Sequence, residues 1–178
     1  MEKKLVSPKF NKKAYIKARI IETLDDLDIA INMWIAGRTR NSAGKVFSAV
    51  KALLSALATK NLDKLSSDWY TKKGYNAPTR SLKGISIDLV KLGYKEVENI
   101  TNIAFLLHDY QYNGFDPDFS KYKNKDEVLH DIILVSKSIL SEIKEWFKEE
   151  WDQDLDKIYE ITSSDLLKLE TEKSRLQL

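Results

Sequence analysis

The feature that most limits the fold of this chain is the spacing of its apolar residues. Large aliphatic and aromatic side chains recur every three or four positions along most of the sequence, which is the period of a helix with one buried face. The 178 residues include only 6 glycines and 3 prolines, too few for a β-rich domain with many tight turns. The pattern therefore predicts an all-α protein.

Four to five main helices are expected. The first covers about residues 10–36, because its apolar stripe continues to Trp34 and Gly37 follows where a helix commonly ends. The second begins at Asn41 or Ser42, whose side chains suit a helix start. The remaining helices are expected over 79–93, 95–112 and 124–147, with a connection at 61–78, a loop at 113–123 and a short helix after Ser163 in a charged tail.

Two local patterns add detail to this prediction. The second helix carries large apolar residues beside a strip of alanines at positions 49, 52 and 56, so a neighbouring helix can approach it closely. It is therefore expected to be the most deeply buried helix. Asn124 is followed three residues later by Glu127, a spacing typical of a capping box at a helix start.

The composition excludes several classes of site and partner. The chain has no Cys, which excludes disulfides, thiolate nucleophiles and Cys-ligated zinc, and its two His exclude a three-His metal centre. A net charge of +2 does not suggest a dedicated nucleic-acid protein. No apolar run approaches ~18 residues and the N-terminus lacks a signal-peptide core, so a soluble, cytoplasmic protein without a membrane partner is expected.

Each histidine is followed by an aspartate, His108-Asp109 and His130-Asp131. Such pairs are similar to those of the metal-dependent HD phosphohydrolases, in which His and Asp ligands converge on a metal that activates water. At ~100° per residue, however, His130 falls with Lys137 on the polar face of its helix. His130 is therefore expected at the surface, and no metal site is predicted.

His108 lies at the edge of the apolar stripe of its helix, just before a loop. A histidine in that position is commonly half-buried and hydrogen-bonded to a carbonyl or carboxylate. Its aromatic neighbours Tyr110, Tyr112 and Phe115 make it the one weak candidate for a catalytic residue.

The segment 36–45 is basic and rich in small residues, like a phosphate-binding loop. Its two glycines are separated by six residues where that loop requires four, and Val46 stands where Ser or Thr would bind magnesium. The triphosphatase interpretation therefore fails. Arg38, Arg40 and Lys45 still surround a helix N-terminus, which attracts anions, so an anion site and a solvated interhelix turn are both retained as interpretations.

Glu22, Asp25 and Asp26 share a face of the first helix. Such a cluster could bind a divalent ion or supply a general acid and base. Helical two-metal bundles require a Glu-x-x-His motif on each of two helices, and the chain has one such motif, Glu127 to His130. A solvated charged surface is the favoured interpretation of this cluster.

Two segments resemble a known family. Residues 41–58, with Lys51-Ala52-Leu53-Leu54 at the centre, look like the second helix of the archaeal PaREP family, which belongs to the HEPN-like helical superfamily. Residues 103–114 are similar to that family's segment of leucine and histidine followed by aromatic and then acidic or glycine residues. With the amphipathic helix at 127–147, the resemblance covers about two thirds of the chain. It implies a fold rather than a reaction, since the family has no established biochemical activity.

The resemblance also supplies a test for nuclease activity. Ribonuclease members of the superfamily use an Arg followed four to six residues later by a His. No Arg stands at that distance before His108 or His130, and Arg40 is followed by Lys45 where a His is required. A lysine with a pKa near ~10.4 is a poor general base at neutral pH. Nuclease activity by this route is not expected.

These observations combine into one architectural prediction. We expect a single domain over residues 1–178, an antiparallel, HEPN-like bundle of four to five main helices with a short C-terminal helix. Trp146, Trp151 and Leu155 are expected to form an exposed apolar face through which a homodimer assembles.

Two functional classes remain open, and whether the protein is an enzyme is left undecided. The first is a non-catalytic module that binds a nucleotide or nucleic acid near Arg38, Arg40 and Lys45, or that binds another protein. The second is a metal-dependent phosphohydrolase or a ribonuclease with a site around His108. No cofactor is predicted in either case.

Overall fold

The computed structural model describes residues 5–65 and 77–176, and over these ranges the protein is all-helical. No strand occurs in the described residues, which confirms the predicted all-α class. The α-helices are α1 (Lys12–Ile35), α2 (Thr39–Lys60), α4 (Leu82–Lys91), α5 (Val97–Asn113), α6 (Lys125–Trp146) and α7 (Gln153–Leu176), with short 3₁₀ helices at Leu62–Lys64 and Thr79–Ser81.

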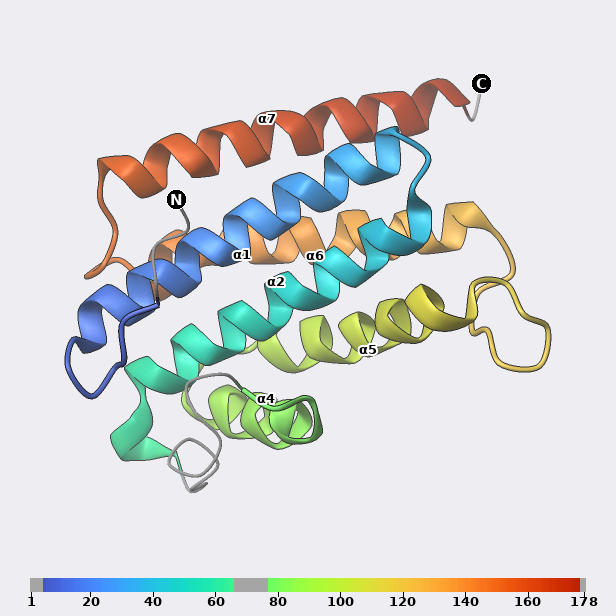
Figure 1. The fold of residues 1–178 in the computed structure, drawn as a ribbon. Coiled ribbons are helices and arrows are strands. Elements are labelled where there is room, and N and C mark those ends of the chain that lie inside the picture. The colour runs from blue at the N-terminus through green and yellow to red at the C-terminus, as the bar shows by residue number, and fades with distance from the viewer. Residues whose placement is uncertain (1–4, 66–76, 177–178) are drawn as a thin grey trace.

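The helices form a bundle with α2 at its centre. Helix α2 packs against α1, α4, α5 and α6, and α7 packs against α1 and α6 (Figure 1). Every residue from Ala52 to Thr59 is buried, because α2 has neighbours on several sides. The prediction that the second helix is deeply buried is confirmed.

Several predicted helix ends are confirmed. The Asn124 side chain accepts a hydrogen bond from the Glu127 amide (3.0 Å), and the Glu127 carboxylate accepts one from the Lys123 amide (2.8 Å), so the start of α6 resembles a capping box. Gly37 follows α1 with φ 76°, and Gly114 follows α5 with φ 56°. Both are left-handed conformations that glycine adopts at little cost.

Other boundaries differ from the prediction. Helix α1 begins at Lys12 with Asn11 as its N-cap, and α2 begins at Thr39, before the predicted Asn41 or Ser42. The Ser42 hydroxyl is not a cap but donates to the Ala30 carbonyl (2.7 Å), which ties α2 to α1. A short side chain that suits a cap is equally able to bond a neighbouring helix, and the sequence does not distinguish these roles.

The prediction of a short C-terminal helix is wrong. Helix α7 is continuous over 24 residues, as long as α1. Leu155, Leu166 and Leu169 are buried, and Thr162 donates to the Leu24 carbonyl of α1 (3.3 Å). The apolar residues of α7 are sparse in sequence, but packing on α1 and α6 supports the whole helix.

The expected exposed apolar face at Trp146, Trp151 and Leu155 is also not observed. Leu155 is fully buried. Trp146 packs edge-on against Tyr94 with ring centroids 5.9 Å apart, and Trp151 packs in the same way against Tyr159 at 5.9 Å. These side chains join the bend between α6 and α7 to the bundle and leave no apolar face there for a second copy.

Two further points bear on the sequence predictions. The aromatic residues Trp69, Tyr70 and Tyr75 of the predicted connection lie outside the described residues. Within the described ranges, no helix has the length and apolar content needed to cross a bilayer.

Candidate functional site

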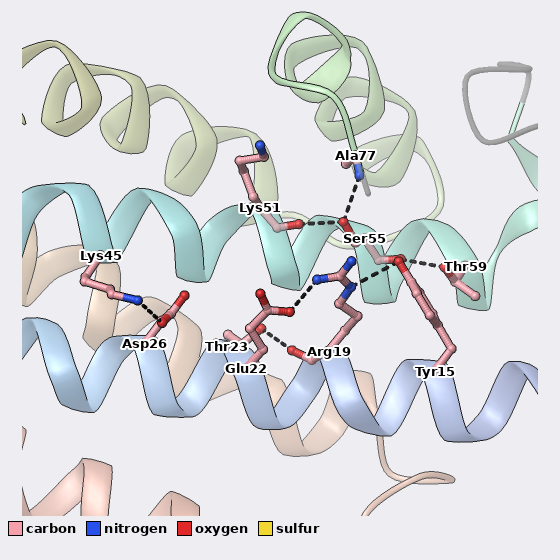
Figure 2. Close-up of polar contacts among 10 residues, drawn as sticks. All are labelled: Tyr15, Arg19, Glu22, Thr23, Asp26, Lys45, Lys51, Ser55, Thr59 and Ala77. Carbon is pink, nitrogen blue, oxygen red and sulfur yellow. Dashed lines mark hydrogen bonds and ion pairs between the residues drawn. The ribbon is translucent and has the colours of Figure 1, made fainter. Parts of the chain in front are cut away.

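The most polar part of the interior lies between α1 and α2. Tyr15, Arg19, Glu22 and Asp26 follow one another at three- and four-residue spacing, so they share one face of α1. That face of α1 packs toward the strip of small residues on α2. Figure 2 shows the polar side chains of the two helices meeting in the space between them. Small residues on one helix thus make room for long polar side chains on the other.

Arg19 is the centre of this network. Its side chain is only 7% exposed, its Nε donates to the Tyr15 hydroxyl (3.1 Å), and its guanidinium pairs with the Glu22 carboxylate. Burial opposes the charge, but the contacts with Tyr15 and Glu22 outweigh it and raise the pKa of Arg19. For Tyr15 the effect of burial is the opposite: it raises the pKa of the hydroxyl, which therefore stays protonated. The network therefore holds a permanent, nearly buried positive charge.

A second ion pair lies further along the same interface. Lys45 Nζ is 2.9 Å from Asp26 Oδ1, which joins the start of α2 to the middle of α1. Burial raises the pKa of Asp26 although Lys45 opposes that effect. Burial and the neighbouring charge of Asp26 also raise the pKa of Asp25. These carboxylates are therefore held partly out of water.

A polar cavity of about 200 Å³ opens beside Arg19. The Ser55 hydroxyl donates to the Lys51 carbonyl (2.8 Å) and accepts from the Ala77 amide (3.0 Å), and the Ser48 hydroxyl donates to the Gly44 carbonyl (3.2 Å). The Lys51 ammonium has no carboxylate partner within the described part of the chain. The lining is formed by Arg19, Glu22, Ser48, Lys51, Ala52 and Ser55.

A larger cavity of about 480 Å³ adjoins the first, because Arg19 and Glu22 line both. It runs along α1, and Leu5 of the segment that precedes this helix also lines it. Its other lining residues combine apolar side chains with two carboxylates: Leu5, Ala18, Ile21, Asp25, Asp26 and Ile29. The Arg19–Glu22 pair thus lies where a cationic polar cavity adjoins an apolar, acidic one.

The three basic residues predicted from sequence do not converge on one point. Arg40 donates through Nε to the Gln111 carbonyl (2.9 Å) and through a second nitrogen to the Tyr112 carbonyl, so it caps the end of α5. Lys45 pairs with Asp26 on α1. Arg38 is exposed at the N-cap of α2. Of the three, Lys45 belongs to the α1–α2 network.

His108 occupies the edge position that its helical phase predicts. It is half-buried and stacks on Phe47, with ring centroids 4.0 Å apart and an interplanar angle of 20°, and it meets Tyr112 edge-on at 5.1 Å. The expected hydrogen bond is not observed, since Nδ1 is buried and has no partner among the described residues. His130 is exposed, as predicted. No group of three metal-ligating side chains occurs within residues 5–65 and 77–176.

The acidic cluster on α1 was only partly predicted. Glu22, Asp25 and Asp26 do share a face, and Glu22 and Asp25 are exposed, although Glu22 pairs with Arg19. Asp26 is buried, so the interpretation as a solvated surface is wrong for Asp26. Neither Arg19 nor Tyr15 was predicted from the sequence. Helical phase gave little signal, because at ~100° per residue Arg19 lies about 100° and Tyr15 about 140° from Ile20 of the apolar stripe.

Residues 18–133, about two thirds of the chain, match the model of the Archaeal PaREP1/PaREP8 family. The chain belongs to this family. In this PaREP1/PaREP8 protein the matched range starts one residue before Arg19, and it includes Asp26, Lys45 and Lys51. The resemblance to the PaREP family is thus confirmed. Neither a curated protein nor a solved structure matches the chain.

Proposed function

We propose that this PaREP1/PaREP8 protein is a non-catalytic binding module that holds the phosphate group of a nucleotide or nucleic acid between α1 and α2. The observation that carries the proposal is a guanidinium with 7% exposure at the wall of an open polar cavity. A planar guanidinium binds phosphate through two parallel hydrogen bonds, and partial burial strengthens such a contact.

The surroundings of Arg19 support an incoming anion. Glu22 is 45% exposed, so its side chain is free to swing toward water while a phosphate takes its place on the guanidinium. Lys51 would add a second positive charge at the cavity mouth, and Lys45 a third further along α2. Arg38, exposed at the N-cap of α2, is proposed as an outer contact for a longer, nucleic-acid ligand.

The chemistry of the cavity favours binding over bond cleavage. Its cationic groups and hydroxyls would bind and orient an anion, whereas Glu22, the carboxylate in its lining, would turn toward water when a phosphate binds Arg19 and is therefore poorly placed to act as a general base. Ser48 and Ser55 donate their hydroxyl protons to backbone carbonyls, which leaves them unactivated as nucleophiles.

Calorimetric titration with inorganic pyrophosphate tests the proposal. We expect saturable binding that weakens with salt, and a loss of about tenfold or more in affinity for Arg19→Gln, since charge-assisted hydrogen bonds contribute roughly 1.5–3 kcal/mol. Arg38→Gln is the matched control, because it removes the same charge from an exposed position outside the cavity.

Arg19→Gln alters a nearly buried residue, so a second variant protects the test against loss of folding. Lys51→Gln changes a half-buried side chain without a carboxylate partner in the described ranges, and it should weaken pyrophosphate binding while leaving the melting temperature unchanged. No binding by the wild-type protein, or equal binding by Arg19→Gln, Lys51→Gln and Arg38→Gln, would refute the proposal.

A second candidate function is a hydrolase with a site at His108. The observation that favours it is the buried Nδ1 atom, which lacks a hydrogen-bond partner among the described residues and would be able to accept a proton. Hydrolysis of a phosphodiester that His108→Asn abolishes and the exposed control His130→Asn retains would support it. Equal rates in both variants would exclude His108 from catalysis.

We also propose that the bundle is antiparallel and HEPN-like and that the protein forms a homodimer. The face at Leu155 that motivated the homodimer is buried, so a second copy would need another surface. A monomeric mass by light scattering would remove this part of the proposal.

A further inference from the structure

We infer that the ligand is a mononucleotide whose base carries an amino group, lying across the two cavities that meet at Arg19 and Glu22. This inference rests on the proposed function, because the phosphate would occupy the α1–α2 cavity described above. Shared lining residues make the two cavities neighbours, so one molecule with two chemically different ends can enter both.

The charges of the two cavities set the orientation of the ligand. Lys51 lines the smaller cavity and not the larger one, whereas Asp25 and Asp26 line the larger cavity and not the smaller one. A phosphate would be repelled by the two carboxylates and attracted to the side of Lys51 and the buried guanidinium. The uncharged part of the ligand therefore belongs in the larger cavity.

The apolar wall of the larger cavity suits a flat ring. Ala18 and Ile21 line it, and Leu5 and Ile29 are each 38% exposed there. Covering these side chains would remove apolar surface from water, which favours binding. The volume of about 480 Å³ falls within the range of roughly 300–1,000 Å³ that is typical of small-molecule sites, and the smaller cavity of about 200 Å³ suits a phosphate alone.

The carboxylates select which ring is accepted. An ionised carboxylate only accepts hydrogen bonds, so it pairs with an amino group and repels a carbonyl oxygen. Asp26 already accepts from Lys45, which leaves Asp25 as the acceptor for a ligand amine. The two pyrimidine nucleotides differ at this point, because cytosine carries an amino group where uracil carries a carbonyl oxygen.

Titration with cytidine monophosphate, uridine monophosphate and inorganic phosphate tests the inference. We expect cytidine monophosphate to bind about fivefold or more tightly than uridine monophosphate, at the low end of hydrogen-bond discrimination because Asp25 is accessible to water. Inorganic phosphate should bind more weakly than cytidine monophosphate, because it leaves the larger cavity empty.

The variant Asp25→Asn sharpens the test. An amide presents both a donor and an acceptor, so the two pyrimidine nucleotides should then bind within about twofold of each other, while binding of inorganic phosphate is retained. Asp109→Asn, an exposed change on α5, is the matched control and should keep the preference for cytidine monophosphate.

The outcomes separate this inference from the proposed function. If inorganic phosphate binds through Arg19 but the two nucleotides bind equally, or uridine monophosphate binds more tightly, the inference is wrong and the phosphate site stands. If neither phosphate nor either nucleotide binds the wild-type protein, both proposals fail together.

Discussion

Helix α1 is packed between α2 and α7, and the charged side chains at these two contacts are paired differently. Toward α2, Arg19 is joined to Glu22 and Asp26 to Lys45, so positive groups meet negative ones. Toward α7, Asp28 forms a side-chain hydrogen bond with Asp165, which brings two carboxyl groups together.

The carboxyl contact depends on a proton. Asp28 Oδ1 is buried and has no hydrogen-bond partner among the described residues. Because an ionised carboxylate only accepts hydrogen bonds, the two carboxyl groups bond to each other only while one of them is protonated. Burial and Asp165 raise the pKa of Asp28 to about 6. Lys168 and Asn32 hold the pKa of Asp165 below its usual value, which assigns the proton to Asp28.

The two contacts of α1 therefore respond differently to pH. The α1–α2 contact keeps its ion pairs at neutral pH, whereas the α1–α7 contact weakens as Asp28 ionises.

Truncation of core leucines should separate the two contacts most clearly. Leu54→Ala on α2 is expected to cost about 2–5 kcal/mol of unfolding free energy, since the side chain is fully buried in the centre of the bundle. Leu166→Ala on α7 should cost less than Leu54→Ala, near the lower end of the same range at about 2 kcal/mol, because α7 packs against α1 and α6 whereas α2 packs against four helices. Urea denaturation measures both, and a larger loss at Leu166 would contradict the comparison.

The hydroxyl of Ser55 should matter far more than that of Ser48. Ser55→Ala leaves the Ala77 amide, which lies in a fully buried residue, without its acceptor, at an expected cost of about 1–3 kcal/mol. Ser48→Ala removes a hydroxyl that donates to the Gly44 carbonyl within α2, and about 0.5 kcal/mol or less is expected. Equal effects in urea denaturation would show that the Ser55–Ala77 bond contributes nothing.

Asp28→Asn should stabilise the protein at neutral pH. The raised pKa means that the stabilisation from Asp28 is complete below its ordinary value of 3.8 and is lost as the pH rises through about 6. An asparagine donates to Asp165 at every pH, so the variant should melt a few degrees higher at pH 7.5. It should also lose this part of the pH dependence between about pH 4 and 6.

Thermal melts at several pH values check that prediction, with the exposed Asp126→Asn as the control. The lowered pKa of Asp165 acts in the opposite direction and below about pH 4, so it does not mask the effect. An unchanged or lower melting temperature for Asp28→Asn at pH 7.5 would show that ionisation of Asp28 beside Asp165 does not destabilise the protein.

The smallest effect is expected at the exposed ion pair between α6 and α7. Lys137 Nζ lies 2.8 Å from the Glu170 carboxylate, and its side chain is largely exposed. Lys137→Gln should cost about 0.2–1 kcal/mol, and the difference should vanish at high salt. A loss above this range, measured by urea denaturation, would mean that α7 docks mainly through charge.

Much of the fold was predictable because local signals and tertiary packing agree. The apolar period located α2, α5 and α6, and the Asn124 and Gly37 signals marked helix ends correctly. The length of α7 was not predictable, since its few apolar residues become a continuous buried stripe only against α1 and α6.

The candidate site was less predictable for a physical reason. The burial of Arg19 depends on the small residues that α2 places opposite it, and the pairing of Lys45 with Asp26 joins positions 19 residues apart. Helical phase identifies which residues share a face, but it does not tell which helix covers that face. Arg40 shows the same limit, because a basic residue at a helix start turned out to cap the end of another helix.

The most direct test of the central claim is to observe the Arg19 side chain itself during a titration with pyrophosphate. In nitrogen-15 spectra recorded at rising pyrophosphate concentration, the Arg19 Nε–H signal should shift and saturate together with the amides of Lys51 and Ser55. The Arg38 signal should move little at the same concentrations. A constant Arg19 signal, or shifts confined to the start of α2, would contradict a phosphate site between α1 and α2.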